Sequence, residues 1–181
     1  HKHRIECPGN DGNQDKNIAV SGDGKKMIVM CPKSGSDEMQ IWYSNDQTFG
    51  TDWATNKRTW TNMRSRFDAT GATQVSYGVA NAGVYMSGDG TKIWVMRSGM
   101  LVYSFDHEHD FQTWTKKSGF PNNGYMTCVP DASVCVASGY DFAGSEKPVV
   151  EMSKDYGLTW TIIKAATADD GNYWDVEISQ D

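Results

Sequence analysis

The sequence lacks an apolar run of the roughly eighteen or more residues that a membrane-crossing helix needs. It also lacks any useful length of the three- and four-residue apolar spacing that is typical of an amphipathic helix. An excess of basic residues is missing too, because 17 Lys and Arg stand against 23 Asp and Glu, for a formal net charge of −6. We therefore expect no membrane span, no helical fold and no nucleic-acid partner, since such a partner favours a basic face.

The composition instead favours β-structure with many turns. The chain holds 18 Gly, 7 Trp and 8 Tyr, and clusters of Ser, Thr and Asp separate its short apolar runs. A length of 181 residues is enough for one domain with a substantial hydrophobic core. We therefore expect a single all-β domain over residues 1–181.

A motif recurs three times: a Ser-x-Asp triplet followed by Thr-Trp-Thr. The copies are Ser44-Asn45-Asp46 with Thr59-Trp60-Thr61, Ser104-Phe105-Asp106 with Thr113-Trp114-Thr115, and Ser153-Lys154-Asp155 with Thr159-Trp160-Thr161. The third copy is uninterrupted, whereas extra residues separate the Asp from the Trp in the first two. Such a repeat indicates serial units of similar structure.

A second recurring element precedes each triplet. Residues 18–30 match residues 84–96, and both contain Gly-Asp-Gly between apolar runs, which is a strong hairpin signal. In the third copy, residues 126–136, Ala132 replaces a glycine, so a different turn type is open there. Each unit reads as four antiparallel strands, and a meander of four strands repeated in series is typical of β-propeller blades. The expected blades are residues 17–64, 83–118 and 124–165.

Residues 153–160 resemble the Asp-box, or BNR, repeat of sialidase-like β-propellers. The resemblance implies a turn between the third and fourth strands of each blade, in which Ser and Asp side chains cap turn amides and the Trp packs beneath. Gly157 permits a positive φ in this turn. The residues expected to build the turns are Ser44, Asp46, Trp60, Ser104, Asp106, Trp114, Ser153, Asp155, Gly157, Thr159 and Trp160.

The two ends of the chain read as parts of one further blade. Residues 172–181 resemble a first strand, and residues 1–8 can be laid over residues 25–32, which hold a second strand. These ends could meet within one molecule, pair between molecules in a head-to-tail homo-oligomer, or belong to a longer protein. Three complete blades are fewer than the usual four to eight, so assembly or truncation is favoured over a lone closed ring.

The four cysteines predict two disulfides. If the centre of the segment between Cys128 and Cys135 is a two-residue turn, these cysteines stand opposite each other on paired strands, at a distance that suits a bridge. By elimination, the second bridge joins Cys7 and Cys31. Disulfides imply an oxidising, extracellular setting. The alternative is four buried thiols that act as small hydrophobic groups.

Few residues suggest chemistry. His107 and His109 have a spacing that could chelate a metal, although a polar insertion in the turn explains them as well. Trp42 and Trp53 are candidates for exposure and for stacking on sugar rings. The resemblance to sialidases would require an arginine cluster and a Tyr–Glu nucleophile in matching motifs, which we do not find. We therefore expect no catalytic residue and no cofactor.

These patterns favour a secreted, non-enzymatic structural or binding module that works through self-assembly or through binding of a protein or glycan. The alternative is a fragment of a propeller glycoside hydrolase whose active site needs further blades.

Overall fold

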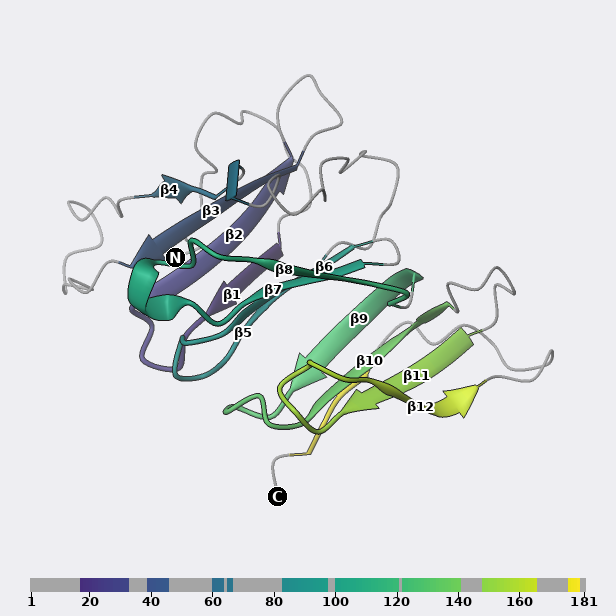
Figure 1. Cartoon of the computed structure of the whole chain (residues 1–181). Helices are drawn as coiled ribbons and strands as arrows, with labels where there is room; N and C mark the ends of the chain where they lie inside the picture. Colours follow the sequence, from purple (N-terminus) through teal and green to yellow (C-terminus); the bar gives the residue numbers. More distant parts are fainter. Residues whose placement is uncertain are drawn as a thin grey trace, which may run out of the picture.

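The computed structural model describes residues 17–32, 39–45, 60–63, 65–66, 83–97, 100–120, 122–140, 148–165 and 176–179. They form three four-stranded antiparallel sheets, each a meander in chain order (Figure 1). The first sheet contains β1 (Asn17–Val20), β2 (Lys26–Pro32), β3 (Met39–Asn45) and β4 (Thr61–Asn62). The second contains β5 (Gly83–Met86), β6 (Ile93–Arg97), β7 (Met100–Ser104) and β8 (Thr115–Ser118). The third contains β9 (Asn122–Cys128), β10 (Cys135–Tyr140), β11 (Pro148–Ser153) and β12 (Thr161–Ala165).

The all-β prediction is confirmed. Within the described ranges, helix is confined to the 3-10 turn η1 (His107–His109) and to residues 65–66. No helix in this part of the chain is long and apolar enough to span a membrane. Residues 176–179, part of the expected final strand, are irregular and belong to none of the three sheets, and residues 1–8 lie outside the described residues.

Each sheet begins with a hairpin whose loop closes in the same way. The first loop residue donates its N–H to the carbonyl of the sixth, and the fourth donates to the carbonyl of the first. The three loops are residues 21–26, 87–92 and 129–134. The fourth residue has a positive φ in each, of 73° at Gly24, 65° at Gly90 and 63° at Ala132. The third loop therefore has the same turn type despite its alanine.

The third loop places Cys128 directly opposite Cys135, as predicted. The predicted two-residue turn is wrong, because Val129 N–H donates to Val134 O at 3.0 Å and Ala132 N–H donates to Val129 O at 2.7 Å. The register is unchanged, since a loop of six residues keeps the same two cysteines facing each other.

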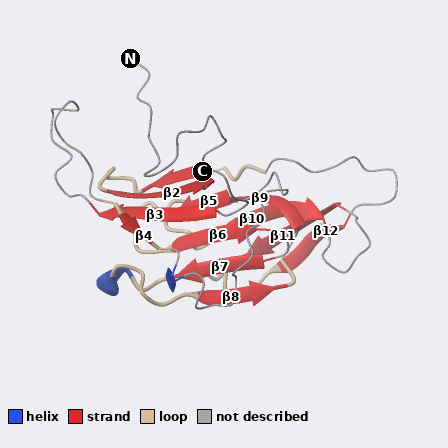
Figure 2. Cartoon of the chain, turned by 90° about the horizontal axis from the view of Figure 1, so that it is seen from above, coloured by secondary structure: helices blue, strands red, loops and turns tan. Residues whose placement is uncertain are grey.

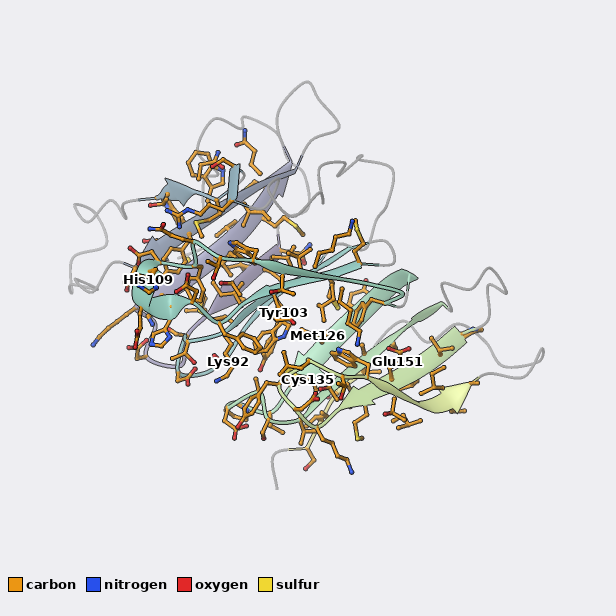
Figure 3. The ribbon with its side chains drawn as sticks, viewed as in Figure 1. Lys92, Tyr103, His109, Met126, Cys135 and Glu151 are labelled. Carbon is orange, nitrogen blue, oxygen red and sulfur yellow. A yellow bond between two sulfur atoms is a disulfide. The ribbon has the colours of Figure 1, made fainter. Side chains whose placement is uncertain are left out.

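The sheets pack in series, and the second sheet is buried on both faces (Figures 1 and 2). Ile93 and Val95 of β6 join a cluster shared with the first sheet, whereas Trp94 and Met96 join a cluster shared with the third. Side chains alternate across a strand, so a strand covered on both faces is a continuous apolar run. Tyr103 of β7 and Met126 of β9, both labelled in Figure 3, pack on this second cluster.

The three hairpin loops are also joined by backbone hydrogen bonds. Gly22 N–H donates to Gly88 O, and Gly88 N–H donates to Pro130 O, each at 2.6 Å. A Cβ on Gly22 would lie 3.1 Å from Gly88 O, and a Cβ on Gly88 would lie 3.0 Å from Pro130 O, so both sites favour glycine. Lys26 Nζ adds a bond to Gly90 O at 2.9 Å. The beginnings of the three sheets are therefore held together in sequence order.

Each hairpin loop also carries an aspartate that accepts local hydrogen bonds. Asp89 accepts from Ser87 Oγ at 2.5 Å and from Thr91 N–H at 3.0 Å, and Asp23 and Asp131 accept bonds of the same kind. Burial raises the pKa of Asp89, but the hydrogen bonds from Ser87 and Thr91 outweigh it and lower that pKa to about 2. Hydrogen bonds likewise lower the pKa of Asp23 and of Asp131.

These shifts predict loss of stability in acid. A carboxyl group whose pKa is lower in the folded state stabilises that state above its unfolded pKa, here 3.8, and the contribution disappears as the pH falls through the folded pKa of about 2. We expect the thermal unfolding midpoint to fall steadily from pH 4 to pH 2. Asp89→Asn should lower the midpoint at pH 7 and flatten its fall below pH 4. An unchanged acid slope in Asp89→Asn would show that this carboxylate does not contribute.

Candidate functional site

The three Ser-x-Asp…Trp segments, here called corner turns, join the third strand of each sheet to the fourth. The third corner turn, residues 153–160, is organised by the buried Ser153. Its Oγ donates to Asp155 Oδ1 at 2.7 Å and accepts the N–H groups of Gly157 at 2.8 Å and Asp155 at 3.3 Å. Tyr156 and Gly157 both have positive φ, of 61° and 77°, which turns the chain sharply around this hydroxyl.

The Asp155 carboxylate and the Trp160 indole close the same turn. Asp155 accepts the Thr159 N–H at 2.8 Å and the Thr159 hydroxyl at 2.5 Å, and Trp160 Nε1 donates to Gly157 O at 2.9 Å. Burial raises the pKa of Asp155, but the hydrogen bonds from Thr159 and Ser153 outweigh it, so the pKa is lowered. These bonds engage the Ser153 hydroxyl, the Asp155 carboxylate and the Trp160 N–H within the turn itself.

Loss of the Ser153 hydroxyl should therefore destabilise the protein. Ser153→Ala removes the acceptor of the buried Gly157 amide, and leaving such a donor unsatisfied costs about 1–3 kcal/mol of unfolding free energy. Ser133→Ala is a suitable control, because Ser133 Oγ bonds only within the exposed loop around Asp131. Urea denaturation should show a smaller loss for the control. Equal losses would contradict a central role for Ser153.

The second corner turn keeps this scheme around an insertion. Asp106 accepts the Thr113 N–H at 3.2 Å and its hydroxyl at 2.9 Å, and Trp114 Nε1 donates to Phe111 O at 2.8 Å. Phe111, with a φ of 56°, therefore takes the place that Gly157 has in the third turn. Its side chain is fully buried and packs edge-on to Tyr43, with ring centroids 5.2 Å apart. Phe111 is not among the residues predicted from the sequence; its spacing of three residues before the Trp is the available signal.

The first corner turn is described only in part. Ser44 is buried, and its hydroxyl has no hydrogen-bond partner among the described residues. Asp46 and Trp53 lie outside the described residues. Trp60 immediately precedes Thr61, which pairs with Tyr43. The same relation holds in the second sheet, where Thr115 pairs with Tyr103, and in the third, where Thr161 pairs with Met152. The three Trp residues therefore have equivalent positions.

The three indoles pack on successive faces. Trp114 packs against the cluster between the first and second sheets, and Trp160 against the cluster between the second and third, 5.0 Å from the Phe120 ring centroid. Trp60 packs with Trp42 on the other face of the first sheet, against Val29 and Cys31. Trp42 is half-buried there, and its Nε1 donates to Gln40 Oε1 at 3.2 Å.

The two histidines lie in η1, inside the second corner turn. His109 is labelled in Figure 3. His109 Nδ1 is 2.5 Å from Asp106 Oδ1, and this hydrogen bond, with the charge of Asp106, raises the pKa of His109 and lowers that of Asp106. The described residues contain no group of three or more His, Cys, Asp or Glu side chains that could hold a metal ion. The arrangement places His109 in the hydrogen-bond network of the turn.

The Cys128–Cys135 disulfide is present, with the two Cα atoms 4.0 Å apart. Cys31 is also disulfide-bonded, and its predicted partner, Cys7, lies outside the described residues. A disulfide is compatible with an extracellular location.

The outer face of the third sheet contains a hollow of about 360 Å³. Its apolar part comes from Met152 and Ile163, and Ile163 is 53 % exposed. The remaining lining residues are Lys154, Asp155, Thr159 and Thr161. The hollow thus combines an apolar floor with hydroxyl and charged groups from the third corner turn.

No family model matches the chain, and no curated protein matches it.

Proposed function

We propose that this chain is a β-propeller-type module of Asp-box blades that acts outside the cell as a non-enzymatic structural unit and works through self-assembly. The carrying observation is that each corner turn between two sheets packs on the sheet before it. The same contact can therefore be repeated beyond either end of the series. Here each four-stranded sheet is taken as one blade.

The propeller arrangement is supported by the joined hairpin loops. In a propeller, the blades are placed radially around a central channel, so equivalent parts of neighbouring blades lie close together. The bonds from Gly22 to Gly88 and from Gly88 to Pro130 connect equivalent loop positions in this way. The three sheets of the described residues are fewer than the four or more blades of a typical ring, so the described part of the chain has an end face on each side of the series.

Self-assembly is supported by the character of these two end faces. Terminal units of a repeat protein need polar outer faces to remain soluble alone. In this chain Ile18 and Val20 of β1 are each 41 % exposed, and they alternate with Ala19, which packs toward the second sheet. At the other end, Ile163 is exposed in the hollow of the third sheet. Apolar groups at both ends favour contact between copies.

A structural role is supported by the hydrogen bonds that the corner-turn carboxylates accept within their own turns. Asp106 and Asp155 each accept hydrogen bonds from a threonine amide and hydroxyl. Their pKa values are lowered, which keeps them ionised as acceptors, whereas a general acid needs a raised pKa. The Cys128–Cys135 disulfide supports the extracellular setting.

Sedimentation velocity over a wide concentration range tests this proposal. The chain has a mass of 20.1 kDa, and we expect species of two or more copies whose fraction rises with concentration. A head-to-tail contact that does not close should give an open series of sizes, whereas a closed ring should give one discrete size. A single 20.1 kDa species at every concentration would contradict self-assembly.

A further inference from the structure

We propose that the hollow on the outer face of the third sheet is a binding site for Trp60, the residue at the end of the first corner turn, of a second copy of this chain. This inference rests on the proposed self-assembly and names the contact that would carry it. The two sheet interfaces within the chain already form the same kind of contact.

The first of these interfaces seats the second corner turn on the outer strands of the first sheet. Phe111 meets Tyr43 of β3 edge-on, at 5.2 Å between ring centroids, and Met63, just after β4, is fully buried in the same cluster. Arg66 Nη1 donates to Asp110 O at 2.5 Å. The second corner turn is thus held by apolar side chains of the first sheet and by one basic side chain that bonds to a carbonyl of the turn.

The second interface seats the third corner turn on the second sheet. Trp160 packs on the cluster that includes Tyr103 of β7. Lys117 Nζ of β8 donates to Leu158 O at 3.4 Å, which again is a basic side chain bonded to a carbonyl of the turn. Gly157 lies against Trp94, since a Cβ there would come within 2.7 Å of Trp94 Nε1.

The hollow occupies the equivalent place on the third sheet. Met152 pairs with the first residue of the fourth strand, as Tyr43 and Tyr103 do in the other two sheets. Ile163 comes two residues after that first residue, as Met63 does in the first sheet and Lys117 in the second. On the first sheet Tyr43 contacts Phe111 of the following corner turn, and Met63 lies in the same cluster. On the second sheet Lys117 bonds to Leu158 O, and Tyr103 packs on the cluster on which Trp160 also packs. On the third sheet they line the hollow together with the basic side chain of Lys154.

Trp60 of the first corner turn is the natural occupant. This turn is the one of the three corner turns that has no sheet before it in the described part of the chain. Its Trp60 lies on the outer face of the first sheet, beside Trp42 and over Val29. An indole offers a large apolar surface, which suits the floor formed by Met152 and Ile163. The resulting contact uses a different surface on each copy and is therefore head-to-tail.

Single charges in the hollow test the proposal. Ile163→Glu places a charge on the floor of the hollow, and burying an unpaired charge is costly, so we expect association at least about tenfold weaker than for the unmodified chain. Ile162→Glu is the matched control: Ile162 is also 53 % exposed, but it does not line the hollow, and association should be unchanged. Both variants change exposed side chains, so both should fold, which circular dichroism checks.

A mixing experiment tests the identity of the occupant. Trp60→Ala removes the inserted indole, and Trp60→Phe is the milder variant if the alanine variant unfolds. Each variant with one blocked end, Ile163→Glu or Trp60→Ala, should sediment as a monomer alone. An equimolar mixture should form one-to-one dimers, because each partner keeps the end that the other lacks.

The outcomes separate this inference from the function on which it rests. Association of the unmodified chain that Ile163→Glu does not weaken would overturn the hollow as the binding site and leave self-assembly standing. A mixture that stays monomeric would show that Trp60 is not the occupant. A monomeric unmodified chain at all concentrations would overturn both the binding site and the self-assembly.

Discussion

Gly157→Ala is expected to lower the free energy of unfolding by about 2–5 kcal/mol, because it combines backbone strain with overpacking. Gly157 has a φ of 77°, which costs a residue with a Cβ roughly 1–2 kcal/mol. The new Cβ would also lie 2.7 Å from Trp94 Nε1 and 3.5 Å from Trp160 Cζ2. Trp94 is fully buried, so its ring has no solvent side into which it can move, and forcing such a core apart costs roughly 1–3 kcal/mol more.

Two glycines provide matched controls for this variant. Gly24 and Gly119 have φ values of 73° and 78°, but a Cβ on either meets nothing within 4 Å. Gly24→Ala and Gly119→Ala should therefore show only the backbone cost of about 1–2 kcal/mol. Urea denaturation of the three variants measures the difference. If Gly157→Ala costs no more than Gly24→Ala, the contact between the third corner turn and Trp94 is not a major source of stability.

The hairpins show how much of the fold could be predicted from the sequence. Asp-Gly between apolar runs correctly placed the turns between β1 and β2 and between β5 and β6, because few residues other than glycine tolerate the required φ. The third hairpin has the same loop although Ala132 carries a Cβ at a φ of 63°. Ala132 is fully buried against the cluster between the second and third sheets. Tertiary packing, which the local sequence does not reveal, holds it there.

The corner turns, too, could be predicted from the sequence only in part. The Ser-x-Asp and Thr-Trp-Thr pattern correctly placed the start of the fourth strand in all three sheets, because the motif fixes local hydrogen bonds. The pattern did not reveal that Phe111 stands in the position of Gly157, since a bulky residue at a positive φ is disfavoured locally. Burial of its ring against Tyr43 offsets that cost. The packing energy that offsets this backbone strain comes from a neighbouring sheet, so it cannot be predicted from the local sequence.

The packing of the candidate ligand-stacking tryptophan also depends on neighbours distant in sequence. Alternation along β3 places Trp42 on the face opposite Ile41 and Tyr43, which is the basis for expecting exposure. In the structure Trp42 is half-buried, because Val29 and Trp60 form a further apolar cluster on that face. The pattern gives the face of a side chain, but not what else lies on it.

Trp94→Ala is expected to cost about 3–5 kcal/mol of unfolding free energy, as is typical of large-to-small changes in a core. Trp94 is 0 % exposed and lies between Tyr85 and Phe105, with ring centroids 5.7 and 5.4 Å away. Its removal would leave a cavity between the second and third sheets. Thermal or urea unfolding measures the loss, and a cost below about 1 kcal/mol, typical of a surface site, would contradict this role.

Trp94→Phe should be much milder than Trp94→Ala. Trp94 Nε1 has no hydrogen-bond acceptor among the described residues, and an unsatisfied buried donor costs about 1–3 kcal/mol. Phenylalanine removes that donor while it keeps an aromatic ring between the sheets, so the loss of volume is partly offset.

Phenylalanine also removes the atom nearest the Cβ in Gly157→Ala. The double variant Gly157→Ala/Trp94→Phe should therefore be more stable than the sum of the two single changes predicts, by about 1 kcal/mol or more, as for residues in direct contact. If the losses of unfolding free energy of the two single variants add exactly in the double variant, the alanine at 157 is strained by its backbone alone. The third corner turn then does not pack on the second sheet through Trp94.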